Sequence, residues 1–435
     1  MPAVEDPPAV EAPPLKPPSR LSVILARSGF LGALSTHDFA MLFSGQFASE
    51  IGNGLIQLAL PWLVLELTGS AFQLGLAFFV QFLPMLLFGL VGGVFVDRWD
   101  RRMTIIVVDT IRALAFFSVG AIYYFDALTP LHLYAVIFLS STLANFFNPA
   151  RAALMPNLVS PAHLRSANSL MEVSRHVGFM VAPVVGGVMI DLIGPAALML
   201  VDGASFLISA ATVTWIGYRQ PRTEPQASLG FMQAAIGVVD ETAAGLKRIM
   251  QTHLLKVAIL IGFALNVMIA PIEVLLPLFV VNVKKAGPDY FALLVAGLLV
   301  GLIAGSLTAP ANSRRFGLGR ITIGAVLVLG VVVTAAPWPP TPWPPFVAMA
   351  LAGVAIGTLN VCQTTLLQGA TTDDERGRIS ATYYTATLGV RPPGFLLMGI
   401  LASAIDIRVL FSLVGSMALV LGLVLSRSEE VRRVR

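Results

Sequence analysis

Residues 89–102 read GLVGGVFVDRWDRR, and this stretch passes from apolar to charged within a few positions. Gly89 and Gly93 stand four residues apart and therefore share one face of a helix. Small residues at this spacing let two membrane helices approach closely. The charged residues that follow are Asp97, Arg98, Asp100, Arg101 and Arg102. Because these side chains are too polar for hydrocarbon, the stretch predicts a spanning helix that ends in a charged loop.

The composition of the whole chain agrees with a membrane protein. The 435 residues are 56% hydrophobic and 12% charged, with a mean hydropathy of +0.81, whereas soluble domains are about 25% charged. The net charge of +4 does not indicate nucleic-acid binding, because the basic residues lie in short loops between apolar segments. The single cysteine, Cys362, excludes an internal disulfide. The five histidines form no metal-ligand spacing, so we expect neither a metal site nor a cofactor.

Apolar segments long enough to cross a bilayer, which needs about 20 residues, recur along the chain. We predict twelve spans, separated by glycine, proline and charged residues. They are residues 39–66, 73–96, 103–125, 132–150, 166–190, 195–217, 255–281, 290–311, 318–336, 346–368, 380–404 and 407–426. The expected fold is an all-α membrane protein of twelve transmembrane helices in two pseudo-symmetric six-helix bundles.

The placement of lysine and arginine predicts the orientation of these spans. All but six of the 28 basic residues fall in the tails or in the even-numbered loops. The six exceptions are Arg112, Arg175, Lys284, Lys285, Arg391 and Arg408. Loops rich in lysine and arginine stay in the cytoplasm. We therefore expect a multi-pass protein of the plasma membrane, functional as a monomer, with both termini cytoplasmic.

The chain also repeats itself at an offset of about 212–216 residues. GLVGG at 89–93 matches GLIAG at 301–305, and IQLALP at 56–61 matches IEVLLP at 272–277. Two homologous six-helix halves explain these matches. The predicted organisation is a disordered proline-rich tail at 1–36, a first bundle at 37–217, a linker at 218–254, a second bundle at 255–426 and a tail at 427–435. Within the linker, residues 229–250 predict an amphipathic helix at the cytoplasmic interface.

The first span carries a polar stripe on one helix face. Its members are Gln46, Glu50, Asn53 and Gln57. A charge facing lipid at mid-bilayer costs at least about 2.5–3.5 kcal/mol, so the stripe is expected to face a wet cavity. Glu50 lies near the midplane, and a carboxyl removed from water can bind and release protons near neutral pH. Glu50 is therefore the first candidate for proton coupling; the alternative is a hydrogen bond to a neighbouring helix.

The second half presents polar groups at matching depths. At an offset of 216 residues, Glu50 aligns with Asn266 and Gln57 with Glu273. Matching polar positions in both halves predict a central pathway between the bundles. Arg391 lies inside span 11 with no acid near it in sequence and is followed by two prolines. It is expected to find an acid or carbonyls on another helix, in a gating or substrate role, and the prolines predict a local break.

Two acid–base pairs at three-residue spacing lie in spans 3 and 5. They are Asp109 with Arg112 and Glu172 with Arg175. Residues three apart share a helix face and can neutralise each other. Structural ion pairs near the cytoplasmic ends of these spans are the favoured interpretation.

The stretch at 89–102 resembles the loop between the second and third helices of the major facilitator superfamily of transporters. LALPWLVLELTGS at 58–70, FFNPARAALMPNLV at 146–159 and GVRPPG at 389–394 resemble its drug:proton antiporter branch, which includes macrolide and enterobactin exporters. The resemblance implies that Asp97 gates transport by contacting the start of helix 11, where the helix dipole attracts a carboxylate. The implied gating loop comprises Gly93, Asp97, Arg98, Arg101 and Arg102. The implied export motif of span 5 comprises Gly178, Pro183, Gly186 and Gly187.

These observations predict a proton-coupled exporter of amphipathic small molecules that works by alternating access, with the solute, protons and the bilayer as its partners. An uncoupled facilitator or importer of the same fold is the alternative. An ATP-driven pump is disfavoured, because no lysine follows a glycine and a phosphate-binding loop cannot form. A membrane-embedded enzyme needs paired catalytic or metal-ligating groups at one depth, which the chain lacks, so no catalytic residue is expected. A non-transporting sensor remains a further alternative.

Overall fold

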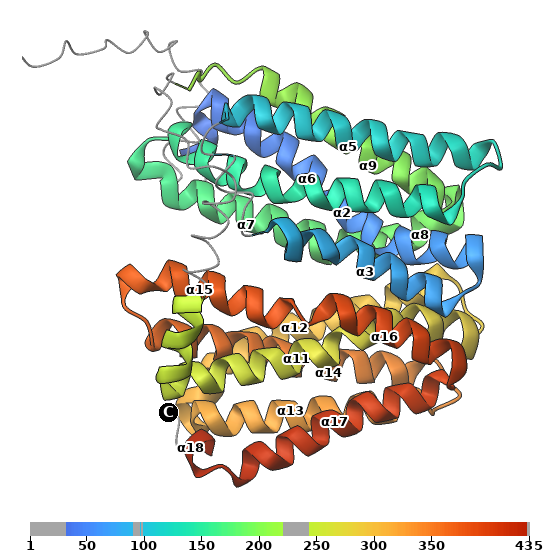
Figure 1. The fold of residues 1–435 in the computed structure, drawn as a ribbon, viewed down its shortest axis with the longest axis vertical. Coiled ribbons are helices and arrows are strands. Elements are labelled where there is room, and N and C mark those ends of the chain that lie inside the picture. The colour runs from blue at the N-terminus through green and yellow to red at the C-terminus, as the bar shows by residue number, and fades with distance from the viewer. Residues whose placement is uncertain (1–31, 90–95, 97–98, 221–242, 433–435) are drawn as a thin grey trace, which may run out of the picture.

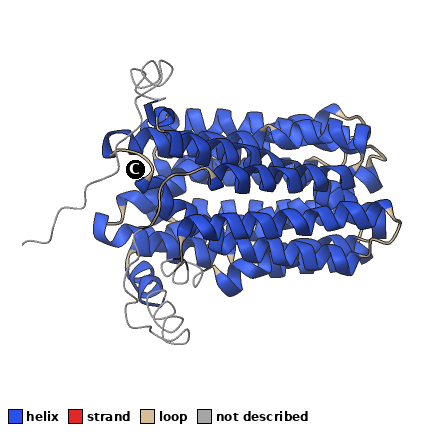
Figure 2. Ribbon diagram, turned by 90° about the horizontal axis from the view of Figure 1, so that it is seen from above, coloured by secondary structure: helices blue, strands red, loops and turns tan. Residues whose placement is uncertain are grey.

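The computed structural model describes residues 32–89, 96, 99–220 and 243–432. Within these ranges the regular structure is helical throughout, without a strand (Figure 2). Twelve helical segments of the described chain are long and apolar enough to cross a membrane. They coincide with the twelve predicted spans, so the predicted fold class is confirmed.

The first half contains spans 1 to 6. Its helices are α2 (His37–Thr68), α3 (Ala71–Phe88), α5 (Arg101–Tyr124), α6 (Pro130–Leu154), α7 (Leu164–Met180), α8 (Ala182–Ile193) and α9 (Pro195–Thr214). The second half contains spans 7 to 12. Its helices are α11 (His253–Leu278), α12 (Pro288–Phe316), α13 (Leu318–Ala335), α14 (Trp343–Gly369), α15 (Asp373–Leu388), α16 (Arg391–Ala404) and α17 (Ile407–Arg427).

Local sequence explains where the helices begin and end. Gly69 ends α2 in the left-handed conformation at φ 59°, which glycine adopts without a steric penalty. Ser70 then caps α3 by accepting a hydrogen bond from the amide of Gln73. Asp100 caps α5 in the same way, accepting from the amide of Met103 at 2.7 Å. Such side chains satisfy amides that lack partners inside the helix.

The fifth span of each half consists of two helices. In the first half, α7 ends at Met180 and α8 begins at Ala182, just before Pro183. In the second half, α15 ends at Leu388 and α16 begins at Arg391, just before two prolines. A proline lacks an amide hydrogen and interferes with the preceding turn, so it interrupts the helix. The break predicted next to Arg391 is present.

The two halves form two layers that meet most closely at one end (Figure 1). We call the end where α2 begins and α17 ends the terminal end. Near the other end, a Cβ added to Gly399 of α16 would lie 2.9 Å from the Cα of Gly75 of α3. Gly187 of α8 similarly packs against Ala292 of α12. Only the absence of side chains on these glycines lets the helices of the two halves touch here.

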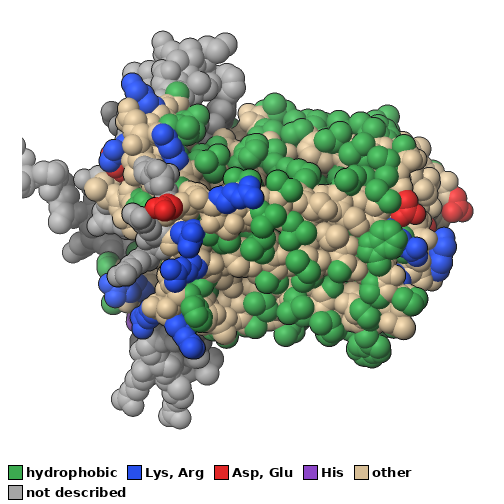
Figure 3. Space-filling view, turned by 90° about the horizontal axis from the view of Figure 1, so that it is seen from below, with side chains coloured by type: hydrophobic (Ala, Val, Ile, Leu, Met, Phe, Trp, Pro, Cys, Tyr) green, Lys and Arg blue, Asp and Glu red, His purple; other side chains and the backbone are tan. Residues whose placement is uncertain are grey.

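The surface separates into an apolar belt and charged ends (Figure 3). Lysine and arginine gather at the terminal end, while hydrophobic side chains cover the middle of this face. At the terminal end, the described linker residues 243–251 are helical and pack on the second half. Ile249 is fully buried there, and Arg248 pairs with Glu375 of α15 at 3.6 Å. Of the amphipathic linker helix predicted at 229–250, residues 229–242 lie outside the described residues, and residues 243–250 are helical.

Candidate functional site

The polar stripe of α2 makes contacts inside the first half. Nη1 of Arg151, on α6, lies 3.2 Å from Oε1 of Glu50 and donates to Oε1 of Gln46 at 3.3 Å. Nε2 of Gln46 donates to Oγ of Ser209 on α9 at 3.1 Å. The side chains of Glu50 and Arg151 are 19% and 21% exposed, so water has access to the pair. The stripe thus joins α2 to α6 and α9, and Glu50 has a positive partner.

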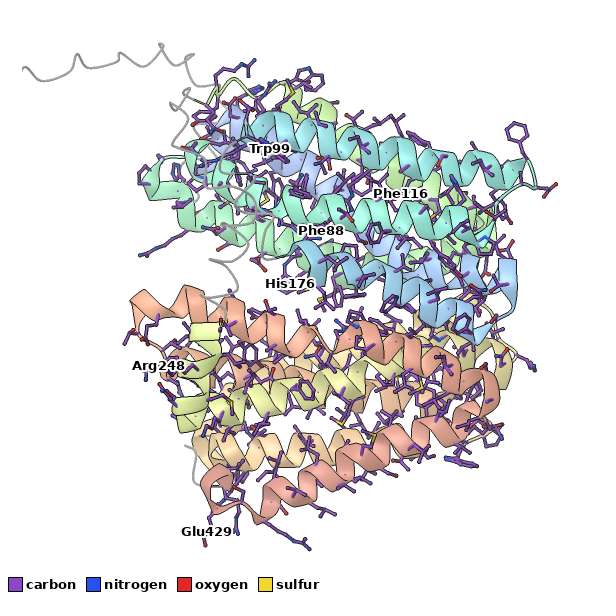
Figure 4. The ribbon with its side chains drawn as sticks, in the orientation of Figure 1. Phe88, Trp99, Phe116, His176, Arg248 and Glu429 are labelled. Atoms are coloured by element: carbon purple, nitrogen blue, oxygen red, sulfur yellow. The ribbon has the colours of Figure 1, made fainter. Side chains whose placement is uncertain are left out.

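The next turn of α2 contacts a buried arginine. Nη2 of Arg112, on α5, donates to Oδ1 of Asn53 at 3.2 Å, and its Nε donates to Oγ of Ser140 on α6 at 3.0 Å. The guanidinium also lies over the ring of Phe206 on α9, 3.9 Å from the ring centroid. Phe206 in turn packs against Phe116, which lies inside the upper half in Figure 4. Arg112 therefore links four helices of the first half.

Two aspartates share this interior. Asp109 of α5 is 0% exposed, and neither of its carboxylate oxygens has a hydrogen-bond partner. Arg112 and Ser209 lie close enough to stabilise a negative charge on Asp109, but neither donates a hydrogen bond to its carboxylate oxygens. Asp202 of α9 is also buried and accepts a hydrogen bond from Ser205 at 3.2 Å. The direct ion pair predicted between Asp109 and Arg112 is not formed, because Arg112 directs its hydrogen bonds to Asn53 and Ser140.

Among the described residues of the second half, one ion pair joins two spans. Nη2 of Arg391, at the start of α16, donates to Oε1 of Glu273 on α11. The same guanidinium lies 4.9 Å from the ring centroid of Phe82 on α3 and 5.6 Å from that of Phe395 on α16. Because Phe82 belongs to the first half, Arg391 contacts both halves. Arg391 therefore pairs with an acid on another helix, which is one of the two kinds of partner expected for it.

Two predicted cavity residues make no contact with these groups. Gln57 is exposed on α2, one turn beyond Asn53. Asn266 of α11 donates to the carbonyl of Gly262 in its own helix at 2.8 Å. The matching depths predicted for the two halves therefore do not bring all the matched side chains into one cluster.

The gating loop implied by the resemblance is described only in part. Gly93, Asp97 and Arg98 lie outside the described residues. Nη1 of Arg101 donates to the carbonyl of Ala153 at the end of α6, at 3.1 Å. Nε of Arg102 donates to the carbonyl of Val213 at the end of α9, at 3.0 Å. The described arginines therefore bind helix C-termini, where carbonyls without helical partners attract cations.

The second predicted pair lies on the surface. Arg175 Nη2 and Glu172 Oε2 of α7 are 2.6 Å apart, and their side chains are 53% and 59% exposed. His176, one residue further along, lies at the boundary between the halves in Figure 4. Exposed pairs of this kind contribute about 0–1 kcal/mol to stability.

The glycines of the implied export motif lie at helix crossings. A Cβ on Gly178 of α7 would overlap the backbone carbonyl of Glu50. Gly186 packs near Leu55 of α2, and Gly187 forms the crossing with α12. Pro183 is buried at the start of α8. This segment packs against α2 at the position of Glu50 and reaches the second half further along.

Sequence reasoning missed two members of the first-half cluster. The predicted span 4 ends at residue 150, but α6 extends to Leu154 and includes Arg151. Asp202 is not among the predicted site residues, yet it is buried beside Ser205. An aspartate within a span otherwise apolar was the available signal.

Comparison with known proteins agrees with this architecture. The family model described as "Major Facilitator Superfamily" matches residues 42–393. The multidrug efflux pump Tap of Mycolicibacterium fortuitum is 27% identical over 89% of this chain and 93% of its own length. Macrolide efflux protein A of Streptococcus pyogenes is 23% identical over 91% of this chain and 97% of its own length.

A solved structure confirms the fold independently. The inward-facing, occupied structure of a bacterial homolog of the human lysosomal transporter Spinster has a TM-score of 0.68 and covers 91% of this chain and 98% of its own, at 14% identity. The family match spans most of the chain and includes both halves. This chain belongs to the Major Facilitator Superfamily.

Proposed function

We propose that this protein exports amphipathic small molecules across the plasma membrane in exchange for protons. The efflux functions in the names of the two relatives support export, and the relatives match nearly the whole chain. The Glu273–Arg391 pair carries the mechanistic part of the proposal. It joins two spans of one half while its guanidinium lies against Phe82 of the other half, so separation of the halves there must alter its surroundings.

The proposed cycle is alternating access of two rocking halves. In this structure the glycine crossings join the halves at the end opposite the termini. The basic terminal end fits the cytoplasmic side, because cytoplasmic loops are rich in lysine and arginine. The conformation is then closed to the outside, and opening requires these crossings to part. A ligand or proton that prefers one conformation shifts the population toward it.

Proton coupling supplies enough energy for useful export. One proton moving through about 100 mV releases roughly 2.3 kcal/mol. At about 1.4 kcal/mol per tenfold ratio, this supports a solute gradient of roughly fifty-fold. The proposal therefore needs only one titrating site per cycle.

Reconstitution into vesicles of phosphatidylethanolamine and phosphatidylglycerol tests the function. With an imposed pH gradient, erythromycin and ethidium are measured as probes of uphill transport. We expect accumulation that a protonophore abolishes and that Glu273→Gln reduces strongly, with the exposed Arg175→Gln as the matched control. Solute flux that does not depend on the pH gradient would indicate an uncoupled facilitator. No flux for any of a wide solute panel would favour a non-transporting sensor.

The orientation is tested with a single cysteine. In a Cys362→Ser background, His176→Cys places a thiol at the boundary of the halves, close to the point where α7 ends at Met180 (Figure 4). A membrane-impermeant maleimide is expected to label it from the cytoplasmic side. Labelling from the outside only would reverse the proposed orientation.

A further inference from the structure

Among the described residues, the buried cluster of the first half contains three carboxylates and two guanidiniums from four helices. They are Glu50 on α2, Asp109 and Arg112 on α5, Arg151 on α6 and Asp202 on α9. The half-buried Asp38, Arg101 and Arg102 are not part of this cluster, because they lie at the starts of α2 and α5 and bind backbone groups. If all five were ionised, the cluster would carry one net negative charge away from water. Burying an uncompensated charge is so costly that a group usually becomes neutral instead.

The three carboxylates differ in how well they are stabilised. Glu50 has Arg151 at 3.2 Å, and Asp202 accepts a hydrogen bond from Ser205. Asp109 is fully buried and accepts none. Asp109 and Asp202 repel each other when both are ionised. Of the three carboxylates, Asp109 is the one whose ionised form would have no hydrogen-bond donor.

The hydrogen bonds of Arg112 also favour a neutral carboxylic acid at Asp109. This guanidinium sits one helical turn from Asp109 and within electrostatic range of Asp109 and Asp202. Its donors nevertheless bind two neutral oxygens, on Ser140 and Asn53. An ionised carboxylate forms stronger hydrogen bonds with a guanidinium than a neutral oxygen does. The observed arrangement is the one expected when Asp109 is a neutral acid.

We propose that Asp109, and not Glu50, is a proton-binding site of this protein, in a cluster with Asp202 and Arg112. The proposal deepens the proton-coupled function above and rests on it for its role in transport. A polar route leads to the site from the partly exposed Arg151, because Arg151 donates to Gln46 and Gln46 donates to Ser209 next to Asp109.

The proton would determine which helices Arg112 joins. With Asp109 neutral, Arg112 ties α5 to α2 through Asn53 and to α6 through Ser140. When the proton leaves, the new carboxylate attracts the guanidinium and competes with both neutral partners. Loss of the proton therefore weakens two links between helices of the first half. This is a local change of charge that can bias a two-state movement.

Infrared difference spectroscopy tests the site without a transported solute. The full-length protein in phosphatidylethanolamine–phosphatidylglycerol vesicles is taken from alkaline to acidic pH, and the carbonyl band of a protonated carboxylic acid is followed. We expect the band of a buried acid in the wild type, its loss in Asp109→Asn and its persistence in Glu50→Gln. The exposed Glu172→Gln serves as the matched control. Loss of the band in Glu50→Gln with persistence in Asp109→Asn would overturn the proposal.

Folding and transport complete the test. Asparagine imitates a neutral acid, so Asp109→Asn should unfold at a temperature close to that of the wild type; failure to fold would show that the charge is required and refute the site. With an imposed pH gradient and erythromycin, Asp109→Asn should lower accumulation from at most about fifty-fold per proton to about one. If the wild type transports nothing but loses its band in Asp109→Asn, the site stands and the proposed function fails. If coupled transport persists in Asp109→Asn, the function stands and the site fails.

Discussion

The two halves share a fold but differ in what joins their helices. The first half has a buried cluster of hydrogen-bonded polar groups in which Arg112 contacts α2, α6 and α9. Close glycine–backbone contacts occur in both halves, as where Gly178 meets Glu50, but in the second half they recur along the crossing of α12 with α14. A Cβ on Gly301 of α12 would overlap the carbonyl of Ala350 on α14, and Gly305, Gly353 and Gly357 lie at the same crossing. Duplicated halves can thus differ in whether a buried charged cluster accompanies the close packing of their helices.

This difference separates two mechanical roles. Hydrogen bonds to a buried charge change when a proton arrives or leaves, whereas contacts between glycine and backbone respond to no charge. The first half is therefore suited to respond to protons, and the α12–α14 pair to move as one body. The Glu273–Arg391 pair is the exception in the second half, and it lies where Phe82 of the first half meets it.

The largest expected effect tests the charged cluster. Arg112→Met removes the cation and leaves buried Asp202 without compensation, which typically costs about 3–5 kcal/mol. Thermal unfolding of the purified protein, followed by circular dichroism, should begin at a markedly lower temperature. Arg112→Lys, which keeps the charge, should lose less. Equal unfolding of Arg112→Met and wild type would mean that the first half does not depend on this charge.

A second substitution tests the packing of the other half. Gly301→Ala places a methyl group against the carbonyl of Ala350, and overpacking of this kind costs about 1–3 kcal/mol. Gly324→Ala in α13 is the matched control, because open space surrounds that glycine. It should be neutral or stabilising by about 0.5–1 kcal/mol. If both variants unfold alike in the same assay, the close crossing is not a source of stability.

A third substitution tests the contact between the halves. Phe82→Leu removes a cation–π contact with Arg391 that is worth about 0.5–2 kcal/mol. The conformation seen here should lose population by about twofold to thirtyfold, measured as slower maleimide labelling of His176→Cys in the Cys362→Ser background. Phe78→Leu, which affects only the ring contact with Phe395, is the control. An unchanged labelling rate in Phe82→Leu would show that this contact does not affect the population of the conformation.

The smallest effect concerns the exposed pair of α7. Glu172→Gln breaks the ion pair with Arg175, which is worth about 0–1 kcal/mol at the surface. The unfolding temperature should hardly change, and any difference should shrink at high salt because ions screen exposed charges. A loss as large as that of Arg112→Met would contradict the distinction between buried and exposed charge.

Much of the architecture was predictable because lipid imposes a simple rule. Every backbone polar group in the bilayer must be bonded internally, so apolar runs of sufficient length become helices. The twelve spans, the repeat and the break before Pro392 followed from that rule and from proline chemistry. The charged residues of the spans were also visible, since Glu50, Asp109 and Arg391 stand out against apolar neighbours.

The sequence by itself determined which segments are helices and which of them contain charge. Only the tertiary structure decided which charges meet. Arg151 reaches Glu50 across 101 positions and Arg391 reaches Glu273 across 118, while Asp109 and Arg112, three positions apart, form no direct pair. The physical reason is that a partner must lie within a few ångströms. The rotation and crossing of packed helices set that distance, and spacing along one helix fixes only a shared face.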